Sequence, residues 1–255
     1  MEKFPSLDVK DRVAVVAGAS RGIGRTLALG LANAGADVVV SSRTVPDLEL
    51  LADEIRAMGR KALVRPADFT KLSDIQALAD AAVTDFGRVD ILVNNAGINI
   101  NKSALEMTEE DWDRVLDINL KSYFFCSQII GRLMVEQRKG KIINVSSTFG
   151  LVGFEKRSAY ASSKGGIGQL TKVLAIEWGP YNVNVNAIAP TATLTAINKE
   201  LFANPEWRKG VLARIPIGRF CEPKDLVGAV VFLASEASNM VTGITLPVDG
   251  GWTAW

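Results

Sequence analysis

Short apolar runs alternate with amphipathic stretches along the whole chain, and no other feature restricts the fold as much. The apolar runs have the length and composition of buried strands, and they cover Arg12–Ala17, Asp37–Ser41, Lys61–Arg65, Asp90–Val93, Lys141–Val145, Asn182–Ile188 and Thr245–Val248. Helical spacing marks Gly22–Ala34, Pro46–Met58, Leu72–Phe86, Glu109–Glu136, Ala159–Trp178 and Pro223–Ala234. We therefore predict an α/β fold class, with a doubly wound parallel sheet of seven strands and helices on both faces.

The chain of 255 residues shows no linker, internal repeat or low-complexity segment. A single domain spanning residues 1–255 is therefore the expected organisation. Its segment Thr191–Pro216 is polar and irregular, with helical patches.

Charge and composition exclude several classes of function. The 29 basic and 28 acidic residues nearly cancel, so no basic field suggests nucleic acid or an anionic membrane as a partner. The chain has no histidine, which removes Ser-His-Asp hydrolysis and most zinc catalysis, and we predict no metal site. Cys126 and Cys221 are expected to be reduced core residues. Without a signal-like apolar start or a run of about 18 apolar residues, we expect a cytoplasmic protein with no membrane partner.

A glycine-rich segment joins the first predicted strand to the first predicted helix. It reads Gly18-Ala19-Ser20-Arg21-Gly22-Ile23-Gly24. Glycines let the backbone turn sharply and let a pyrophosphate approach main-chain N–H groups, while the helix start supplies free donors and the positive end of a dipole. Many strand–helix turns also carry two glycines, so the motif is weak alone; its place after strand one favours a dinucleotide site.

The end of the second predicted strand indicates which dinucleotide binds. Sites for NAD usually carry an acidic residue there, which accepts hydrogen bonds from the ribose hydroxyls. Here the strand ends Ser41-Ser42-Arg43, where Arg43 can pair with a 2′-phosphate and Ser42 can donate to it. Arg21 is placed to reach the same phosphate, although both arginines are also explained as solvated surface charges. The sequence favours NADP(H) over NAD(H).

Tyr160 and Lys164 are four residues apart at the start of a predicted helix, so they project from one face. An ammonium beside a phenol favours the phenolate, and we expect it to lower the tyrosine pKa from its ordinary value of about 10. Ser147 follows the predicted strand Lys141–Val145 and lies at the carboxyl end of the sheet, where ligands of open α/β folds bind. A Tyr-x-x-x-Lys pair is common in helices and gains weight only beside the glycine motif.

Together these motifs resemble the short-chain dehydrogenase/reductase family, and the resemblance covers essentially the whole chain. It implies a Rossmann-type sheet. The matching positions are the glycine motif at Gly18, Gly22 and Gly24, the adenine-contacting Asp68, the Asn-Asn-Ala-Gly signature at Asn94–Gly97, and Asn119, Ser147, Tyr160 and Lys164. The predicted cofactor contacts are Gly18, Ser20, Arg21, Gly22, Ile23, Gly24, Ser42, Arg43, Asp68, Phe69, Asn95, Ala96, Gly97, Tyr160, Lys164 and Pro190.

The resemblance also implies a role for each catalytic residue. Tyr160 protonates the carbonyl oxygen, or takes the proton in oxidation, while Ser147 hydrogen-bonds that oxygen. Lys164 contacts the nicotinamide ribose, and Asn119 keeps a proton-relaying water in place. The implied activity is that of an NAD(P)-dependent oxidoreductase acting on CH–OH or C=O groups (EC 1.1.1.-). One departure from the family is Thr191, which stands where relatives usually have glycine.

Substrate choice in the family resides in variable loops, here Ile98–Leu105, Gly150–Ser158 and about 191–216. Their hydrogen-bonding and cationic side chains, such as Asn101 and Arg157, suit a small carbonyl or alcohol substrate with hydroxyl or carboxylate groups, such as a sugar acid or polyol. Solvated loop charges explain each residue equally well. The chain is most similar to bacterial gluconate 5-dehydrogenase-type members.

Two alternatives to a sugar-acid enzyme stay open. The first is a 3-oxoacyl-carrier-protein reductase, whose acidic protein partner needs a basic patch; the candidates for it are Arg132, Arg138, Lys139 and Lys141. The second is a dinucleotide sensor without catalysis, which is disfavoured because the full catalytic set is present. By resemblance, a homotetramer or homodimer is expected.

Overall fold

The computed structural model describes residues 4–195 and 202–254 of the chain. Strands and helices alternate as predicted. The strands are β1 (Val13–Ala17), β2 (Asp37–Ser41), β3 (Ala62–Val64), β4 (Ile91–Asn94), β5 (Gly140–Val145), β6 (Val183–Pro190) and β7 (Thr245–Val248). The α-helices are α1 (Gly22–Asn33), α2 (Val45–Ala57), α3 (Leu72–Phe86), α4 (Glu109–Leu116), α5 (Ser122–Gln137), α6 (Ser158–Trp178), α8 (Pro205–Leu212) and α9 (Val227–Ala234).

All seven strands form one parallel sheet in the order β3-β2-β1-β4-β5-β6-β7. The prediction of a doubly wound, Rossmann-type sheet is confirmed. The chain starts in the middle of the sheet at β1, winds outward to β3, and then returns to β4 on the other side of β1. Loops leaving β1 and β4 therefore diverge at the carboxyl edge, which is where open α/β sheets bind ligands.

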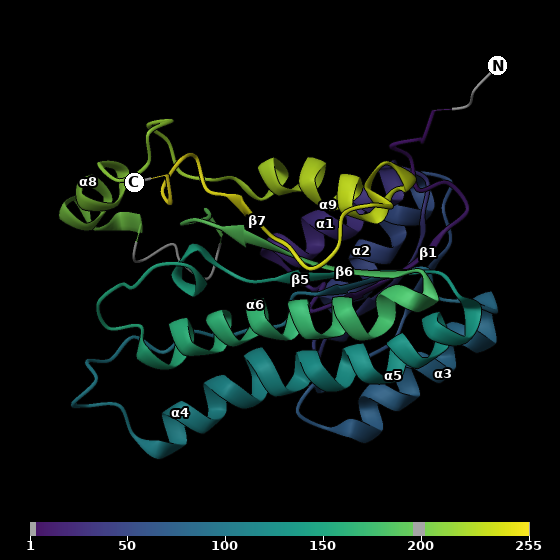
Figure 1. Cartoon of the computed structure of the whole chain (residues 1–255), viewed down its shortest axis with the longest axis horizontal. Coiled ribbons are helices and arrows are strands. Elements are labelled where there is room, and N and C mark those ends of the chain that lie inside the picture. The colour runs from purple at the N-terminus through teal and green to yellow at the C-terminus, as the bar shows by residue number, and fades with distance from the viewer. Residues whose placement is uncertain (1–3, 196–201, 255) are drawn as a thin grey trace.

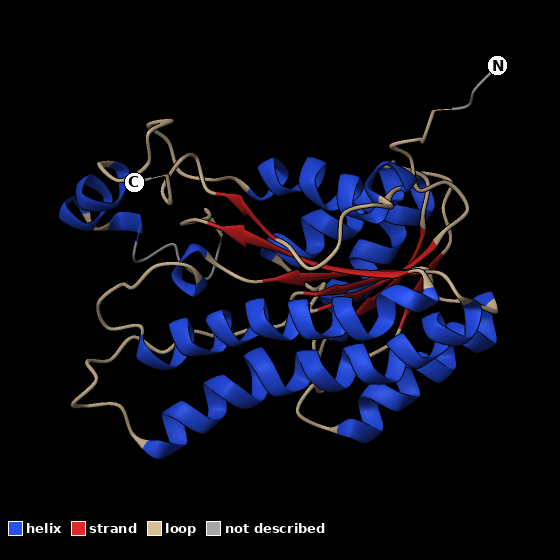
Figure 2. Cartoon of the chain, viewed as in Figure 1, coloured by secondary structure: helices blue, strands red, loops and turns tan. Residues whose placement is uncertain are grey.

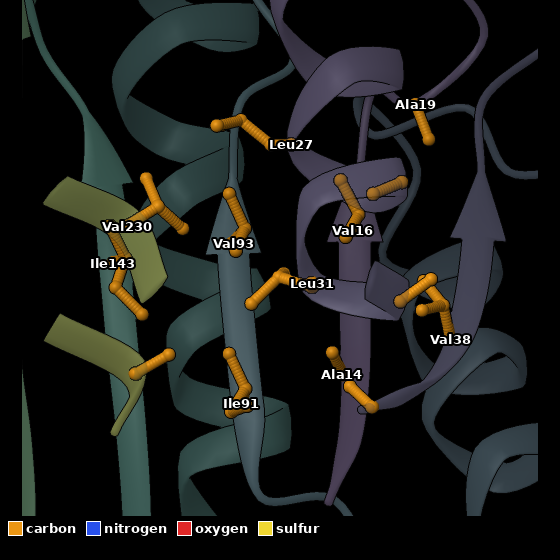
Figure 3. Packing of buried hydrophobic residues seen from close by; sticks show 14 of the residues in the cluster. Ala14, Val16, Ala19, Leu27, Leu31, Val38, Ile91, Val93, Ile143 and Val230 are labelled. Carbon is orange, nitrogen blue, oxygen red and sulfur yellow. The ribbon is translucent and has the colours of Figure 1, made fainter. Parts of the chain in front are cut away.

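Helices cover both faces of the sheet, with α1, α2 and α9 on one side and α3, α5 and α6 on the other (Figure 1). Each face has its own buried apolar cluster. On the α1 face, Leu27 and Leu31 point down onto the strands near Val16 and Val93 (Figure 3). The central strand β1 is buried on both faces, so its sequence is apolar throughout rather than alternating, and its neighbour β4 is apolar up to the Asn94 that ends it.

The predicted helix Glu109–Glu136 contains an irregularity. A π-helical turn, Asp117–Lys121, separates α4 from α5, and Asn119 lies within this turn. Such turns insert one extra residue into a helix and are frequent at functional sites. The Asn119 side chain is fully buried, between the loop after β4 and α6.

A third, smaller apolar cluster lies beyond the carboxyl edge of the sheet. It joins α8 and the neighbouring loops to the C-terminal segment through Phe202, Val211, Ile215, Phe220 and Trp252. Phe149 and Phe154, from the loop between β5 and α6, pack against it. The segment expected to be irregular therefore contains an ordered helix, α8, which begins at Pro205 after an N-capping Asn204.

A buried polar chain crosses the middle of the sheet. Asn94 at the end of β4 donates to Asn144 Oδ1 on β5 at 2.9 Å and to Ser127 on α5 at 2.9 Å. Asn144 in turn donates to Thr171 on α6 at 3.0 Å. Asn94 and Asn144 are direct neighbours in the strand register. Strands and helices on this face are thus joined by hydrogen bonds as well as by apolar contact.

No helix within the described residues has the length and apolar character needed to cross a membrane. The described residues also hold no cluster of three or more acidic or cysteine side chains that could bind a metal ion.

Candidate active site

The predicted site residues converge at the carboxyl edge of the sheet. The arrows of β5, β6 and β7 point to the end of the molecule that carries α8 and the C-terminus (Figure 2). The loops after β1, β2, β3 and β4, together with the start of α1, carry the predicted cofactor contacts up to Gly97, Ser147 follows β5, and Pro190 ends β6. The other three predicted residues lie on helical segments, Asn119 in the π-helical turn and Tyr160 and Lys164 on α6. The predicted site is therefore elongated and runs across the carboxyl ends of these strands; we call it the strip.

The glycine loop is packed so tightly that Gly18 and Gly24 have no room for a side chain. Gly18 has φ +81°, and a Cβ there would lie 2.7 Å from the backbone of Ala96. A Cβ at Gly24 would lie 2.9 Å from the carbonyl carbon of Gly18 and closer still to its oxygen and to Asn95 Nδ2. Asn95 fixes the loop by donating from Nδ2 to Gly18 O at 2.8 Å. Part of the Asn-Asn-Ala-Gly signature thus holds the glycine loop in shape.

The start of α1 is open for an anion. Arg21 precedes the helix with an exposed side chain that makes no capping hydrogen bond, and the first turn contains no acidic residue. The first N–H groups of the helix therefore keep their donor capacity and face no local negative charge. Ser20 and Ile23 are partly buried beside them.

The end of β2 carries no acid, as the sequence indicates, and Arg43 is exposed next to it. Ser42 is 8% exposed and its Oγ accepts from Thr44 N at 3.2 Å. Asp68 lies after the neighbouring strand β3. Hydrogen bonds from Thr70 hold the pKa of Asp68 below its usual value, and the charge of Arg43 lowers it by a smaller amount. Phe69 is buried in the apolar cluster of the α3 face, so only its backbone is open to a ligand.

Asn119 ties the loop after β4 to α6. Its Oδ1 accepts from Ile98 N at 2.8 Å, and its Nδ2 donates to Ile98 O at 2.9 Å and to Ser163 Oγ at 3.1 Å. A Cβ on Gly97 would lie 3.2 Å from Asn119 Oδ1 and 3.7 Å from Lys164 Nζ. Asn119, Gly97 and Lys164 are therefore immediate neighbours, as their assignment to one site requires.

Ser147 and Tyr160 are brought together by the short 3₁₀ turn η2 (Thr148–Gly150) and the start of α6. Ser147 Oγ accepts from Phe149 N at 3.2 Å, which leaves its own proton free to donate. Burial raises the pKa of Tyr160, and a hydrogen bond from Ser147 and the charge of Arg157 oppose that rise. Tyr160 is therefore a neutral phenol at neutral pH.

The expected role of Lys164 in lowering the tyrosine pKa does not appear in this structure. Lys164 Nζ lies 5.7 Å from the Tyr160 ring centroid and donates to Val145 O at 2.7 Å instead. The buried carbonyl at the end of β5 needs a donor, and the ammonium supplies it. Burial lowers the pKa of Lys164 to about 7. The contributions that oppose the rise of the Tyr160 pKa come from Ser147 and Arg157.

The end of β6, next to β5, lies at the opposite end of the strip from β2. Pro190 is buried as the last residue of the strand. Thr191, the residue that replaces the usual glycine, is 7% exposed, and its Oγ1 has no hydrogen-bond partner in the described structure. A buried hydroxyl without a partner is unfavourable unless a ligand completes it.

Arg157 lies in a predicted substrate loop, but the sequence did not single it out as a site residue. Arg157 was grouped with charges that solvation explains, yet it is 6% exposed and contacts Asn101 of the loop after β4. Burial lowers its pKa, while Tyr160 and Glu155 raise it. Nothing in the local sequence distinguishes it from its exposed neighbour Lys156.

These features fit a dinucleotide. The tight glycine loop and the uncapped start of α1 suit a pyrophosphate, and the acid-free end of β2 accepts a phosphate. Toward β5 and β6, the partnerless Thr191 hydroxyl suits a polar group such as a carboxamide. The strip thus leads from a phosphate-binding end to the proton-donating Tyr160.

Comparisons with known proteins agree with this site. Residues 18–253 match a family model described as enoyl-(acyl carrier protein) reductase. The 2-dehydro-3-deoxy-D-gluconate 5-dehydrogenase of Escherichia coli K12 is 43% identical over 98% of both chains. A putative NAD(P)-dependent gluconate 5-dehydrogenase from Beutenbergia cavernae, with bound NADP, has a TM-score of 0.93 and 40% identity, and covers 98% of this chain and 99% of that one. A gluconate 5-dehydrogenase from Burkholderia cenocepacia, in complex with NADP and tartrate, has a TM-score of 0.94 and 35% identity over 98% of both chains.

Proposed function

Because the chain belongs to the short-chain dehydrogenase/reductase family, where it acts as an oxidoreductase on CH–OH or C=O groups, we propose that it interconverts a ketone and a secondary alcohol of a sugar acid or polyol with NADP(H). The observation that carries this proposal is the position of Ser147, Tyr160 and Lys164 at the carboxyl edge, beside the glycine loop. A nicotinamide dinucleotide, when bound, supplies or accepts the hydride.

Proton transfer is the work of Tyr160. With a raised pKa it holds its proton at neutral pH and gives it to a carbonyl oxygen as that oxygen gains charge. Ser147 has a free O–H to donate, so it orients the same oxygen and stabilises the phenolate that remains. In the oxidative direction, Tyr160 accepts the proton of the alcohol, and Ser147 again donates a hydrogen bond to the substrate oxygen.

Lys164 and Asn119 position the other parts of the site. The Lys164 ammonium is anchored on Val145 O, within reach of Gly97, and there it would contact the ribose of the cofactor. Asn119 holds the Ile98 backbone in place with its side chain. The π-helical turn at Asn119 supports a role for its backbone in holding a water molecule that passes protons to solvent.

A preference for NADP(H) is supported by the phosphate end of the strip. Arg43 and Arg21 are exposed, and neither forms an ion pair with a described residue. Ser42 and Arg43 replace the acid that an NAD site uses, and two solved relatives hold NADP. The remaining proposed contacts are Gly18, Ser20, Gly22, Ile23, Gly24, Asp68, Phe69, Asn95, Ala96, Gly97, Tyr160, Lys164 and Pro190.

A sugar-acid substrate is supported by the relatives. The Escherichia coli relative is a dehydrogenase named for a deoxy sugar acid, and the Burkholderia relative holds the dicarboxylate tartrate. The segment from about 191 to 216 is the proposed substrate loop, within a single domain formed by the whole chain. We further propose a cytoplasmic homotetramer or homodimer.

The alternative of a carrier-protein reductase has less support in the structure. Of the four candidate basic residues, Lys141 donates to Asn184, Ser238 and Asn239, and Arg138 donates to Pro180 O. Lys141 also lies at the start of β5, at the opposite end of that strand from Ser147. Lys141 and Arg138 therefore make contacts within the fold, and Lys141 does so away from the end of β5 that leads to Ser147.

The test is a spectrophotometric screen with NADPH and NADH, offered separately with ketoses, keto-sugar acids and acetoacetyl thioesters. We expect turnover of keto-sugar acids or ketoses with NADPH. Turnover confined to the thioesters would transfer the protein to fatty-acid chemistry. Tight NADPH binding without turnover of any carbonyl would instead indicate a sensor.

A further inference from the structure

Arg157 is a buried arginine without an anionic partner. It directly precedes α6, and its Nη1 donates to Asn101 Oδ1 and, at 3.3 Å, to Lys156 O. Its Nε is buried and has no hydrogen-bond partner. No carboxylate of residues 4–195 or 202–254 forms an ion pair with it, and the exposed Glu155 influences it only at longer range.

This state is unusual because buried charges in proteins are normally paired, and an unsatisfied buried N–H is costly. The buried Asp90 follows this rule and pairs with Arg88 at 2.5 Å. The half-exposed Lys102, in the same loop as Asn101, also pairs with a carboxylate, that of Asp111, at 2.5 Å. The buried Lys164 has no carboxylate partner among the described residues, but its Nζ donates to Val145 O at 2.7 Å. Arg157 differs from Lys164 because its buried Nε has no partner at all, so an external carboxylate is a natural partner for it.

The position of Arg157 is beside the reacting groups. Its charge is coupled to the Tyr160 phenol, and its guanidinium carbon lies 5.9 Å from the Phe149 ring centroid and 6.0 Å from that of Phe154. On the same aromatic wall, Arg214 lies 5.3 Å from the Phe154 ring centroid. Apolar rings around a guanidinium keep water away and strengthen its attraction for an anion.

We propose that Arg157 binds the carboxylate of the substrate and selects carboxylated ketones and alcohols over neutral polyols. The Nε–Nη2 edge of its guanidinium lies away from the Nη1 contact with Asn101, and it matches the two oxygens of a carboxylate. Asn101 fixes the orientation of the guanidinium. The inference rests on the proposed function, since Ser147 and Tyr160 must hold the reacting oxygen while Arg157 holds the acid.

A purely structural role makes a different prediction. If Arg157 only tied the Asn101 loop to the start of α6, its removal would weaken turnover of charged and neutral substrates to the same extent. If Arg157 acted only through its electrostatic effect on Tyr160, its removal would likewise change the turnover of both substrates to the same extent. The ratio of kcat/KM for a charged and a matched neutral substrate therefore separates carboxylate binding from the other two roles.

The experiment compares 5-ketogluconate with L-sorbose, which carries CH₂OH in place of the carboxylate. We expect the wild-type protein to prefer the acid, and Arg157→Gln to reduce that preference by about 100-fold, as when one partner of a buried charged pair is removed. Asn101→Asp provides a second variant that keeps Arg157. The introduced carboxylate would pair with the Arg157 guanidinium in place of the substrate carboxylate. We therefore expect the preference for the acid to fall while thermal stability is retained.

The control is Lys172→Gln, which removes an exposed charge from the same helix α6 without any described contact at the site. We expect the control to keep the wild-type preference. The inference would be overturned if the wild-type protein reduced both ketones with equal kcat/KM, or if the preference for the acid were unchanged in both Arg157→Gln and Asn101→Asp. Either result would leave the proposed function standing. Failure of the wild-type protein to reduce either ketone would overturn both.

Discussion

Replacing Gly24 by alanine tests the packing of the glycine loop most directly. The new Cβ would lie 2.9 Å from the carbonyl carbon of Gly18, where ordinary contact begins at 3.4 Å, and closer still to Gly18 O and Asn95 Nδ2. The neighbouring atoms belong to a backbone carbonyl and to the amide that holds it at 2.8 Å, so they cannot move without breaking that hydrogen bond.

The magnitude follows from three contributions. Overpacking costs about 1–3 kcal/mol, and losing the Asn95–Gly18 hydrogen bond costs about 1–3 kcal/mol. The helix propensity of alanine returns about 1 kcal/mol. We expect a net loss of about 1–5 kcal/mol in the free energy of unfolding, which lowers Tm by roughly 2–20 °C for a chain of this size.

The assay is thermal unfolding together with fluorescence titration of NADPH. Gly228→Ala is the matched control, because Gly228 is exposed at the start of α9 and a Cβ there would meet nothing within 4 Å. This variant is expected to gain up to about 1 kcal/mol and to bind NADPH normally. If Gly24→Ala unfolded at the wild-type temperature and bound NADPH with wild-type affinity, the argument from close packing would be refuted.

The other predictions concern the chemistry of the strip. Tyr160→Phe is expected to lower kcat by about 1,000-fold while the Kd for NADPH stays within a few-fold, and retained turnover would remove Tyr160 as the acid. Arg43→Asp is expected to lower the ratio of kcat/KM with NADPH to that with NADH by about 100-fold, and an unchanged ratio would show that Arg43 does not contact the phosphate. Because burial lowers the pKa of Lys164 to about 7 in the folded state, the folded protein binds fewer protons than the unfolded chain above that pH, so stability should rise between about pH 7 and 9. Lys164→Met should flatten this rise in Tm; Lys141, with a pKa of about 8, adds to it, and an identical slope in the variant would contradict the assignment.

Much of the fold is predictable from the sequence because its central strands are buried on both faces and form short apolar runs. The ranges of β2, β7 and α3 agree with the predicted bounds, since each is a periodic or continuous apolar run ended by a polar residue or glycine. The π-helical turn was not predicted. One extra residue in a long amphipathic helix barely changes its hydrophobic pattern, so Glu109–Glu136 is read as continuous.

The site was predicted where local motifs define it. Gly18 and Asn95 are adjacent because they follow β1 and β4, which are paired, and Gly24 packs against both from the first turn of α1. The roles of the individual residues stay predictions. Arg157 shows where sequence reasoning stops, because its burial depends on Phe149 and Phe154 from its own loop and on the distant Trp252 that packs against them.

The Asn94–Asn144 pair has a consequence for how the chain reaches its native state. Valine-rich parallel strands offer few cues to alignment, since a two-residue shift still places apolar side chains on the same faces. Such a shift between β4 and β5 would break the hydrogen bond between the two amides and leave the buried Asn144 Oδ1 without its donor, at a cost of about 1–3 kcal/mol. The pair therefore disfavours misaligned folding intermediates. It also fixes the register in which β4 ends beside β5, so that the loops carrying Asn95 and Ser147 leave neighbouring strands at the same edge of the sheet.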